Sequence, residues 1–340
     1  MRENADLPKV TVAVPVRNCR NTVEKLLESL LRLDYPSEKL EIITVDGSST
    51  DGTREIIAKY PVKLITEPGL GLNHARNLGL KNASGTIIAF TDGDCTVPRD
   101  WIYKIVRNFN DKTVGAVGGT VVPHNPENLY AHYGQDSLIP VMPVVQKKVV
   151  LDRVWFPYPV GCNMAFRREA LEKIGGFDPE FKIGYDEIDT LDRLVRQGFK
   201  ISCDPEVTVE HFHRSTLKSL LRQWFRYGVG QALFRKKTSN RFLRRILAWA
   251  LVAFIVYFPT ILGLALLSAF FKSPLLGYAA FLLLVTPLAI TTSLYVWKLP
   301  TKKVMPFSFI FATLDFLRVL ALFSGDAYAT ATSKIHLAEE

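Results

Sequence analysis

The chain has 340 residues, enough for a catalytic domain and a second module. Its formal net charge is +9, and no aromatic surface motif accompanies the basic residues, so the charge indicates a membrane surface and argues against nucleic acid as a partner. The four cysteines have neither metal-type nor Cys-x-x-Cys spacing, which suits a reducing compartment, and the polar start MRENADLPK shows no signal segment.

Apolar and amphipathic segments alternate through the N-terminal half. We predict strands over 10–16, 41–45, 62–66, 86–91 and 114–122, and helices over 22–33, 53–60, 73–83 and 98–108. This alternation indicates a doubly wound, Rossmann-like α/β fold with a mostly parallel sheet. Ligands bind beyond the carboxyl ends of such strands. Asn18, Asp46, Asp92 and Asp94 occur at those ends.

The segment TDGD, residues 91–94, follows an apolar strand. An Asp-x-Asp turn at a strand end holds two carboxylates at a fixed separation, which suits Mg²⁺ or Mn²⁺ and a diphosphate. An ordinary Asp-Gly turn is the alternative. Asp46, in ITVDGSSTDGT, is a candidate to accept hydrogen bonds from a nucleotide, whereas Ser49 to Asp51 are explained as caps of the next helix.

Two acidic and histidine-rich segments follow an irregular region, residues 123–158, which we interpret as an acceptor-side loop. In GYDEIDTLDRL, Asp186, Glu187 and Asp189 open a helix, where they serve either the helix dipole or general-base catalysis, and Asp189 can pair with Arg193. In VEHFHR, His211 and His213 share one face of a strand. They are either structural or metal ligands.

The segment LKSLLRQWFRYG, residues 217–228, has an apolar stripe at helical spacing. Gln223 and Arg226 lie away from this stripe. The pattern predicts an amphipathic helix on a membrane, with its polar side either toward a site or simply solvated.

Two uncharged segments, 246–271 and 275–297, each exceed the roughly 20 residues that span a bilayer core. A third, 305–323, contains Asp315 and Arg318, which can pair on a helix, and it is either an interfacial helix or a third span. Basic residues flank the pair of segments, whereas the loop between them has only Lys272. The positive-inside rule therefore predicts a multi-pass cell-membrane protein with a cytoplasmic N-terminal domain.

The order AVPVRN, VDGSSTDGT, HARNLGL, FTDGD, GCNMAFRREALEKIGGFD, an acidic pair and QxxRY resembles the family 2 glycosyltransferases with the GT-A fold. The resemblance covers about residues 9–235. We expect a GT-A domain over 1–215, a membrane-interface helix and basic linker over 216–245, and a transmembrane region over 246–325.

The resemblance implies roles for named residues. Pro15, Val16 and Asp46 match the nucleotide pocket, and Asn18 and Arg76 lie near the donor. Asp94 is implied to bind Mn²⁺ or Mg²⁺ and Asp92 the ribose or diphosphate side of the donor, with His211 or His213 as a further metal or diphosphate contact. Gln223 and Arg226 match the acceptor or diphosphate motif QxxRW of membrane-bound polysaccharide synthases, with Tyr227 in place of Trp.

The acidic pair departs from the family's usual Glu-Asp order. Glu187 falls on the position of the catalytic base, with Asp186 beside it as the alternative. The resemblance implies an inverting transfer from a UDP- or GDP-sugar. An ionised phosphate acceptor needs no base, so the acidic pair favours a sugar hydroxyl on a lipid-linked glycan or glycolipid.

Three alternatives stay open. A polyprenyl-phosphate glycosyltransferase and a polysaccharide synthase share these motifs, and a non-catalytic membrane scaffold shares the fold. No feature of the sequence indicates an oligomeric state.

Overall fold

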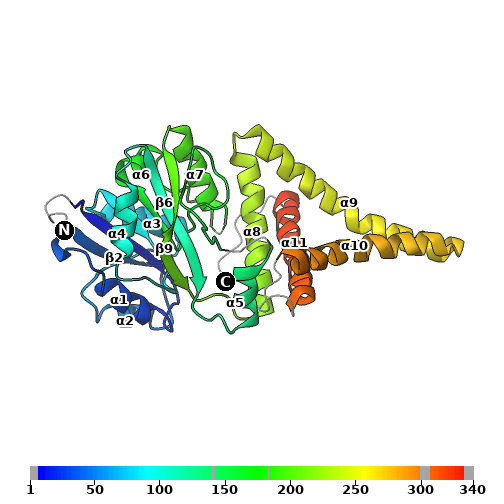
Figure 1. Ribbon diagram of the computed structural model, residues 1–340, viewed down its shortest axis with the longest axis horizontal. Coiled ribbons are helices and arrows are strands. Elements are labelled where there is room, and N and C mark those ends of the chain that lie inside the picture. The colour runs from blue at the N-terminus through cyan, green and yellow to red at the C-terminus, as the bar shows by residue number, and fades with distance from the viewer. Residues whose placement is uncertain (1–6, 139–141, 183, 299–306, 333–340) are drawn as a thin grey trace. The chain divides into compact units, whose positions relative to one another are not determined.

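The computed structural model describes residues 7–138, 142–182, 184–298 and 307–332. They form two compact units: 7–135 with 142–182 and 184–213, and 136–138 with 214–298 and 307–332 (Figure 1). The strands are β1 (Val10–Val16), β2 (Leu40–Asp46), β3 (Lys63–Thr66), β4 (Ile87–Phe90), β5 (Cys95–Thr96), β6 (Val114–Pro123), β7 (Val149–Leu151), β8 (Met164–Arg167) and β9 (Lys200–His211). The helices are α1 (Val23–Leu31), the short 3₁₀ turn η2 (Ser37–Lys39), α2 (Thr53–Ile57), α3 (Leu72–Asn82), α4 (Trp101–Asn108), α5 (Leu129–Asp136), α6 (Arg168–Lys173), α7 (Asp186–Arg196), α8 (Leu217–Lys237), α9 (Arg241–Phe271), α10 (Pro274–Lys298) and α11 (Ser308–Thr332).

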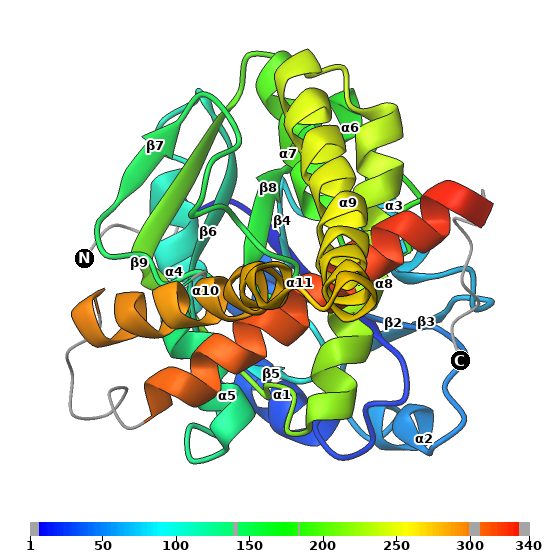
Figure 2. The same ribbon diagram turned by 90° about the vertical axis from the view of Figure 1, so that its right-hand side faces the viewer.

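The first unit is built on one mixed sheet, which Figure 2 shows from a second side. Its strand order is β3-β2-β1-β4-β8-β6-β9-β5, and β7 pairs with β9. The expected parallel pairing holds for β3-β2-β1-β4 and for β6 with β9. The expectation of a mostly parallel sheet is wrong beyond these strands, because β8, β5 and β7 pair antiparallel with their neighbours. These strands follow loops and turns, and antiparallel pairing needs no helical crossover.

The strand β1 explains how the sheet is covered on both faces. Val10, Val12, Val14 and Val16 point toward the cluster that contains α1 and α4, whereas Ala13 belongs to the cluster on the opposite face. This alternation follows from the two-residue repeat of a strand. All seven residues of β1 are buried, so its carboxyl end is held rigidly where ligands are expected to bind.

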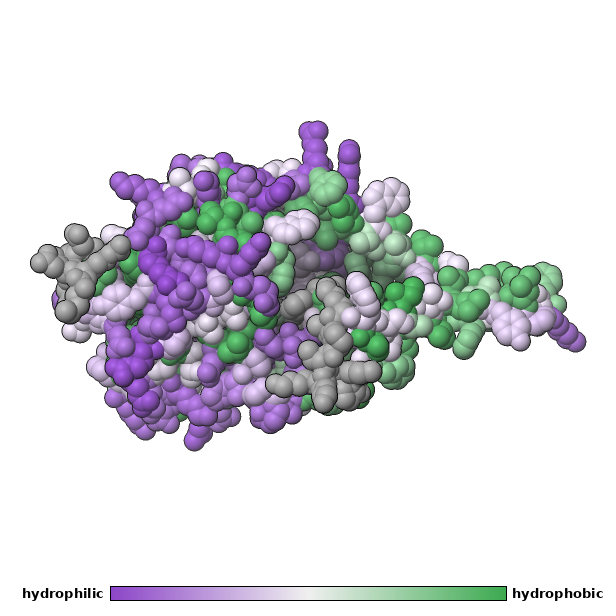
Figure 3. All heavy atoms as spheres, viewed as in Figure 1, coloured by the Kyte–Doolittle hydropathy of each residue, from purple (hydrophilic) through white to green (hydrophobic). Residues whose placement is uncertain are grey.

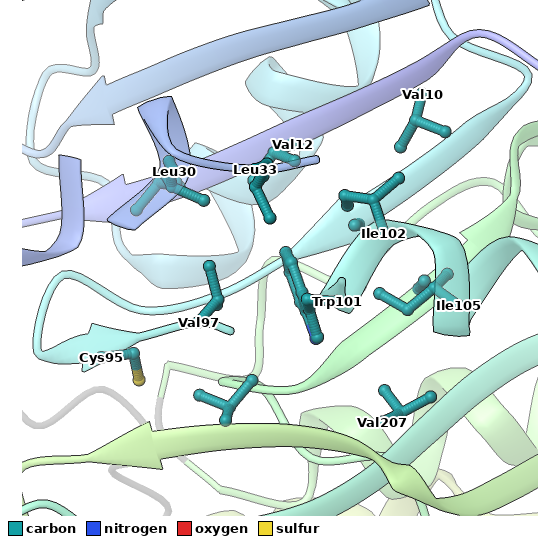
Figure 4. Close-up of a cluster of buried hydrophobic side chains, with 14 of the residues drawn as sticks. Val10, Val12, Leu30, Leu33, Cys95, Val97, Trp101, Ile102, Ile105 and Val207 are labelled. Carbon is teal, nitrogen blue, oxygen red and sulfur yellow. The ribbon is translucent and has the colours of Figure 1, made fainter. Parts of the chain in front are cut away.

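Trp101 lies at the centre of the larger cluster and is completely buried (Figure 4). Its indole N–H donates a hydrogen bond to Oδ1 of Asn163 at 3.2 Å. The Asn163 amide in turn donates to the carbonyls of Thr120 and Val207. The Asn163 amide therefore joins α4, β6 and β9 to the segment before β8. These hydrogen bonds hold the NMAF stretch, residues 163–166, in place.

The second unit consists mainly of α8 to α11. Three of its helices, Arg241–Phe271, Pro274–Trp297 and Ser308–Thr332, are long and apolar enough to cross a membrane. The predicted segments 246–271 and 275–297 fall inside the first two, and the third predicted segment falls on α11 from residue 308 onward. Its residues 305 and 306 lie outside the described residues. Hydrophobic side chains cover the surface of α9 and α10 in Figure 3. Such a surface suits lipid more than water.

The charged residues of α11 are paired inside this unit. Asp315 and Arg318 are 3.0 Å apart, which confirms that they pair, and the hydroxyl of Tyr295 donates to Asp315 at 2.6 Å. Arg235 pairs with Asp326 at 2.7 Å. Paired charges inside a helical bundle cost far less in a membrane than isolated ones. The two acidic residues therefore do not argue against α11 as a span.

The helix α8 does not lie alone on a surface. It packs against α11, and its residues 228–235 are buried. The backbones approach closely at two glycines: a Cβ on Gly228 would lie 1.8 Å from the carbonyl oxygen of Leu322, and one on Gly325 would lie 1.9 Å from that of Phe225. Only glycine allows this crossing.

Candidate active site

Asp46 is the last residue of β2, and its side chain is fully buried. Its Oδ2 accepts a hydrogen bond from the N–H of Ser49 at 3.2 Å and lies 3.7 Å from Nε of Arg54. Its Oδ1 has no hydrogen-bond partner within the described part of the chain. A buried acceptor without a partner costs free energy. Asp46 is therefore suited to accept a hydrogen bond from a ligand.

The predicted donor residues at the end of β1 lie beside Asp46. Pro15 and Val16 pair in register with the last two residues of β2. Asn18 has a left-handed backbone, with φ of 52°, and its Oδ1 accepts the N–H of Thr50 at 2.9 Å. The Asn18 side chain therefore fixes the loop that follows β2.

Asp92 and Asp94 occupy the tight turn after β4. The carbonyl of Asp94 accepts an N–H from the segment after β9. Oδ1 of Asp94 lies 3.4 Å from Nε2 of His211. The two side chains meet because β5 and β9 pair antiparallel and bring the end of β9 against this turn. The structure thus joins two of the three predicted metal ligands, Asp94 and His211.

His213, the third predicted ligand, lies beyond the end of β9. Its Nδ1 is 3.0 Å from Nδ1 of His211 and 3.1 Å from the His211 carbonyl oxygen. Burial and the neighbouring His211 lower the pKa of His213 to about 4, so this ring is neutral at physiological pH. The expectation that both rings share one strand face does not hold, because the strand ends at His211. His213 contacts His211, not the carboxylate.

A divalent cation fits the pair formed by Asp94 and His211. Asp94, His211 and Cys95 each offer one ligand atom, and these three atoms lie within 4.8 Å of one another. A carboxylate and an imidazole suit Mn²⁺ and leave open positions for a substrate diphosphate.

Arg76 is the centre of the charged residues. It projects from α3 and is 1% exposed. Its guanidinium donates a short hydrogen bond to Asp186 and lies 3.9 Å from Oδ1 of Asp92. It donates a further hydrogen bond to Oδ1 of Asn73 at 3.2 Å, and the ring of Phe177 lies 5.4 Å from it. Arg76 therefore connects the turn after β4 with the start of α7.

The two members of the acidic pair have different surroundings. Asp186 is 3% exposed and ion-paired with Arg76, so its charge is neutralised. Glu187 accepts the N–H of Gly161 at 3.0 Å through Oε1. Burial and the neighbouring Asp186 raise the pKa of Glu187 to about 8, despite the opposing effect of Arg76. Glu187 is thus the carboxyl whose proton exchanges near neutral pH, which suits a general base.

Gly161 lies against both Arg76 and Glu187. A Cβ on this residue would lie 2.2 Å from Nη2 of Arg76 and 2.9 Å from Oε1 of Glu187. The backbone must come this close for its N–H to reach Glu187. The requirement for glycine is therefore steric.

The remaining predicted residues belong to the second unit. The amide of Gln223 donates a hydrogen bond to the hydroxyl of Tyr227 at 2.8 Å. Arg226 lies on the same helix, α8, one turn further on. The role of Gln223 and Arg226 toward the acceptor or the diphosphate stays a prediction. The predicted pairing of Asp189 with Arg193 is confirmed at 2.8 Å.

Three residues near the site were missed by sequence reasoning. Glu67 follows β3, is 1% exposed, and accepts the N–H groups of Gly69 and Leu70. Its position after a strand is the same signal that identified Asp46. Cys95 and Gly161 carried no such signal, because their importance comes from side chains that are distant in sequence.

Family models and similar proteins of known type all match this chain to glycosyltransferases. The model described as "Glycosyl transferase family 2" matches residues 11–175, and "N-terminal domain of galactosyltransferase" matches residues 152–215. Similar proteins include glycosyltransferase AglE of Haloferax volcanii, 29% identical over 73% of this chain and 82% of that protein. The O-antigen chain rhamnosyltransferase WbaN of Salmonella anatum is 31% identical over 66% and 73%.

A third relative is named for a sugar linked to dolichyl phosphate. It is the dolichyl N-acetyl-α-D-glucosaminyl phosphate 3-β-D-2,3-diacetamido-2,3-dideoxy-β-D-glucuronosyltransferase of Methanococcus voltae, 25% identical over 67% of this chain and 74% of that protein. Among solved structures, a mannosyltransferase from Pyrobaculum calidifontis in complex with GDP-Man and Mn²⁺ has a TM-score of 0.63 and 24% identity. The match covers 97% of this chain and 89% of the mannosyltransferase chain. This likeness confirms the predicted GT-A fold followed by C-terminal helices.

Gly161→Ala should lower turnover about 100-fold, because displacing a reacting group by about 1 Å has that effect. The added Cβ must push away either Arg76 or Glu187. Steady-state transfer rates of purified variants measure the loss. Gly263→Ala is the matched control, since a Cβ there meets nothing within 4 Å. Equal rates for Gly161→Ala and the wild type would show that this close contact is not needed.

Proposed function

Since the chain belongs to the family 2 glycosyltransferases, we propose that it transfers a sugar, with inversion, from a UDP- or GDP-sugar to a hydroxyl of a lipid-linked acceptor at the cytoplasmic membrane face. One observation carries the proposal: Arg76 gathers Asp92, Asp186 and Glu187 next to the pair of Asp94 and His211. A donor diphosphate and a catalytic base are needed together in such a reaction.

The donor is placed at the ends of β1, β2 and β4. The unpartnered Oδ1 of Asp46 accepts a hydrogen bond from the nucleotide, with Pro15 and Val16 as the wall of this pocket. Asn18 shapes the loop, and Asp92, held 3.9 Å from Arg76, faces the ribose or diphosphate side of the donor. Gln223 and Arg226 are proposed for the acceptor or diphosphate side.

GT-A glycosyltransferases commonly use a divalent metal, and Asp94 and His211 would hold Mn²⁺ or Mg²⁺ here. When bound, the ion supplies charge stabilisation for the diphosphate leaving group. The structural relative from Pyrobaculum calidifontis contains Mn²⁺. His213 supports the proposal by its contact with the His211 ring, since the partner of a ligating imidazole orients it.

Glu187 takes the proton from the acceptor hydroxyl. Asp186 is committed to Arg76, so its carboxylate serves to hold the guanidinium and to raise the pKa of Glu187. The N–H of Gly161 orients Glu187. A base with a pKa near the working pH combines a sufficient ionised fraction with a strong tendency to accept the proton.

A lipid-linked sugar is the acceptor we favour. The three apolar helices and the acidic pair support it, and the relative from Methanococcus voltae is named for a dolichyl phosphate-linked sugar. A polyprenyl phosphate is the second candidate acceptor. The polysaccharide synthase is less well supported, because two or three spans are few for a channel. The scaffold is less well supported, because a non-catalytic protein would not need the acidic residues.

The first unit is proposed to face the cytoplasm. Lys236, Lys237, Arg241, Arg244 and Arg245 precede or open α9, whereas Lys272 alone lies between α9 and α10. Protease added to right-side-out vesicles should leave residues 1–235 intact, and protease added to inverted vesicles should cleave them. The reverse pattern would contradict the orientation.

Asp94→Ala should abolish metal-dependent transfer while the protein stays folded. The reason is the loss of the carboxylate that faces His211. Transfer with and without Mn²⁺, together with thermal unfolding, measures both effects. Asp34→Ala is the control, because that carboxylate is half exposed on the surface. Full activity of the wild type in excess chelator would contradict the metal requirement.

Glu187→Gln should lower turnover about 10²–10⁴-fold, the usual contribution of general-base catalysis, with donor binding retained. Asp186→Asn should lower it less. Glu172→Gln, at an exposed position of α6, is the matched control. If Asp186→Asn is the more damaging change while thermal unfolding shows that the variant stays folded, the assignment of Glu187 as the base is wrong. If neither change slows transfer, the acceptor is a phosphate.

The pH dependence should report the same carboxyl. A base acts only when deprotonated, so kcat/KM should rise with pH and level off above about 8, the pKa to which Glu187 is raised. Asp186→Asn removes a charge that raises this pKa, so the profile should move to lower pH. A wild-type profile that is flat between pH 6 and 9 would rule out Glu187 as the titrating base.

A further inference from the structure

A cysteine thiol lies beside the proposed metal ligands and has no part in the proposed reaction. Cys95 follows Asp94 directly and stands opposite His211 in the antiparallel pairing of β5 and β9. Side chains opposite each other in such a pair lie on one face, with Cβ atoms about 4.5–5.5 Å apart. Cys95 lies at the edge of the hydrophobic cluster in Figure 4.

The three donor atoms are close to the spacing of a tetrahedral site. Oδ1 of Asp94 is 3.4 Å from Nε2 of His211 and 4.0 Å from Sγ of Cys95. One ligand atom from each of the three residues lies within 4.8 Å of the other two. Bonds of about 2.0–2.3 Å to a tetrahedral Zn²⁺ place ligand atoms roughly 3.3–3.8 Å apart. Movements of less than about 1 Å would bring these atoms into range.

The Cys95 thiol is directed at the proposed ligands. Cys95 is completely buried, and its S–H donates to Oδ1 of Asp94 at 4.0 Å. The sulfur therefore already faces the carboxylate with which it would share a cation.

We propose that Asp94, Cys95 and His211 form a binding site for a thiophilic d¹⁰ cation, Zn²⁺ or Cd²⁺, which excludes the catalytic cation. The ion forms a bond to Sγ of Cys95, and the thiol proton passes to the solvent. Hard ions such as Mg²⁺ and Mn²⁺ prefer oxygen ligands to sulfur, so they bind through Asp94, with His211 as the nitrogen ligand, and leave the thiol protonated.

The proposal predicts competition, and this part rests on the proposed function. Because both kinds of cation need Asp94 and His211, only one can be bound at a time. Zn²⁺ binds nitrogen, oxygen and sulfur ligands more tightly than Mn²⁺ does. Low concentrations of a thiophilic cation should therefore inhibit the enzyme, and excess Mn²⁺ should restore activity.

The direct test is a Cd²⁺ titration of the purified full chain in detergent with a non-thiol reductant, followed by the ultraviolet absorption of the cadmium–thiolate bond. The wild type should show this band saturating at one Cd²⁺ per chain, and Mn²⁺ should reduce it. Cys95→Ala should lose the band and at least about tenfold in Cd²⁺ affinity. Cys203→Ala, at a buried thiol that donates to the Pro157 carbonyl, is the matched control and should keep the band.

Separate outcomes identify a failure of each part. A band that persists in Cys95→Ala overturns the assignment, and its loss in Cys19→Ala instead would place the site at Cys19. If Cys95→Ala does not fold, as judged by thermal unfolding, Cys95→Ser replaces it, with the same loss expected. A wild type without a band contradicts the site itself. If the protein binds Cd²⁺ with this band but transfers no sugar, the proposed function fails and the site stands.

Discussion

A guanidinium keeps its charge in a protein interior, so burying Arg76 obliges the fold to surround it with carboxylates. Arg76 is 1% exposed, and Asp186 and Asp92 both lie against it. These three residues come from α3, the turn after β4 and α7, which are separated by many residues. The ion-pair network therefore fixes how the proposed donor residues at the end of β4 meet the proposed base at the start of α7. Loss of one partner would leave a buried charge without compensation.

The same network divides the work between the two adjacent acids. Asp186 neutralises Arg76, and its negative charge then helps to keep the proton on Glu187 near neutral pH. These opposite surroundings are the reason for proposing different roles for the two neighbouring carboxyl groups. On the metal side, the antiparallel pairing of β5 with β9 brings His211 to Asp94, and the same pairing places a thiol beside them. The antiparallel part of the mixed sheet therefore places both His211 and the Cys95 thiol beside Asp94.

Much of the fold could be predicted because its signals are local. The strand over 10–16 and the helices over 53–60 and 73–83 come from apolar periodicity and turn residues, and the structure has elements at those places. The short strands β5, β7 and β8 could not be foreseen, since their pairing depends on distant partners. In the site, Asp46, Asp92 and Asp94 follow from strand ends. The tie between Arg76 and Asp186, 110 residues apart, and the steric role of Gly161 could not, because neither leaves a pattern in neighbouring residues.

The organisation of the site depends most on the coupling between Arg76 and Asp186, and a double-mutant cycle measures this coupling directly. The free energy of unfolding would be determined for the full chain in detergent and for Arg76→Met, Asp186→Asn and the double variant. Because each single change leaves a buried partner unsatisfied, we expect a coupling free energy of about 2 kcal/mol or more, with the double variant less destabilised than the sum of the two single variants. Additive effects, with a coupling near zero, would contradict the claim that this ion pair organises the site.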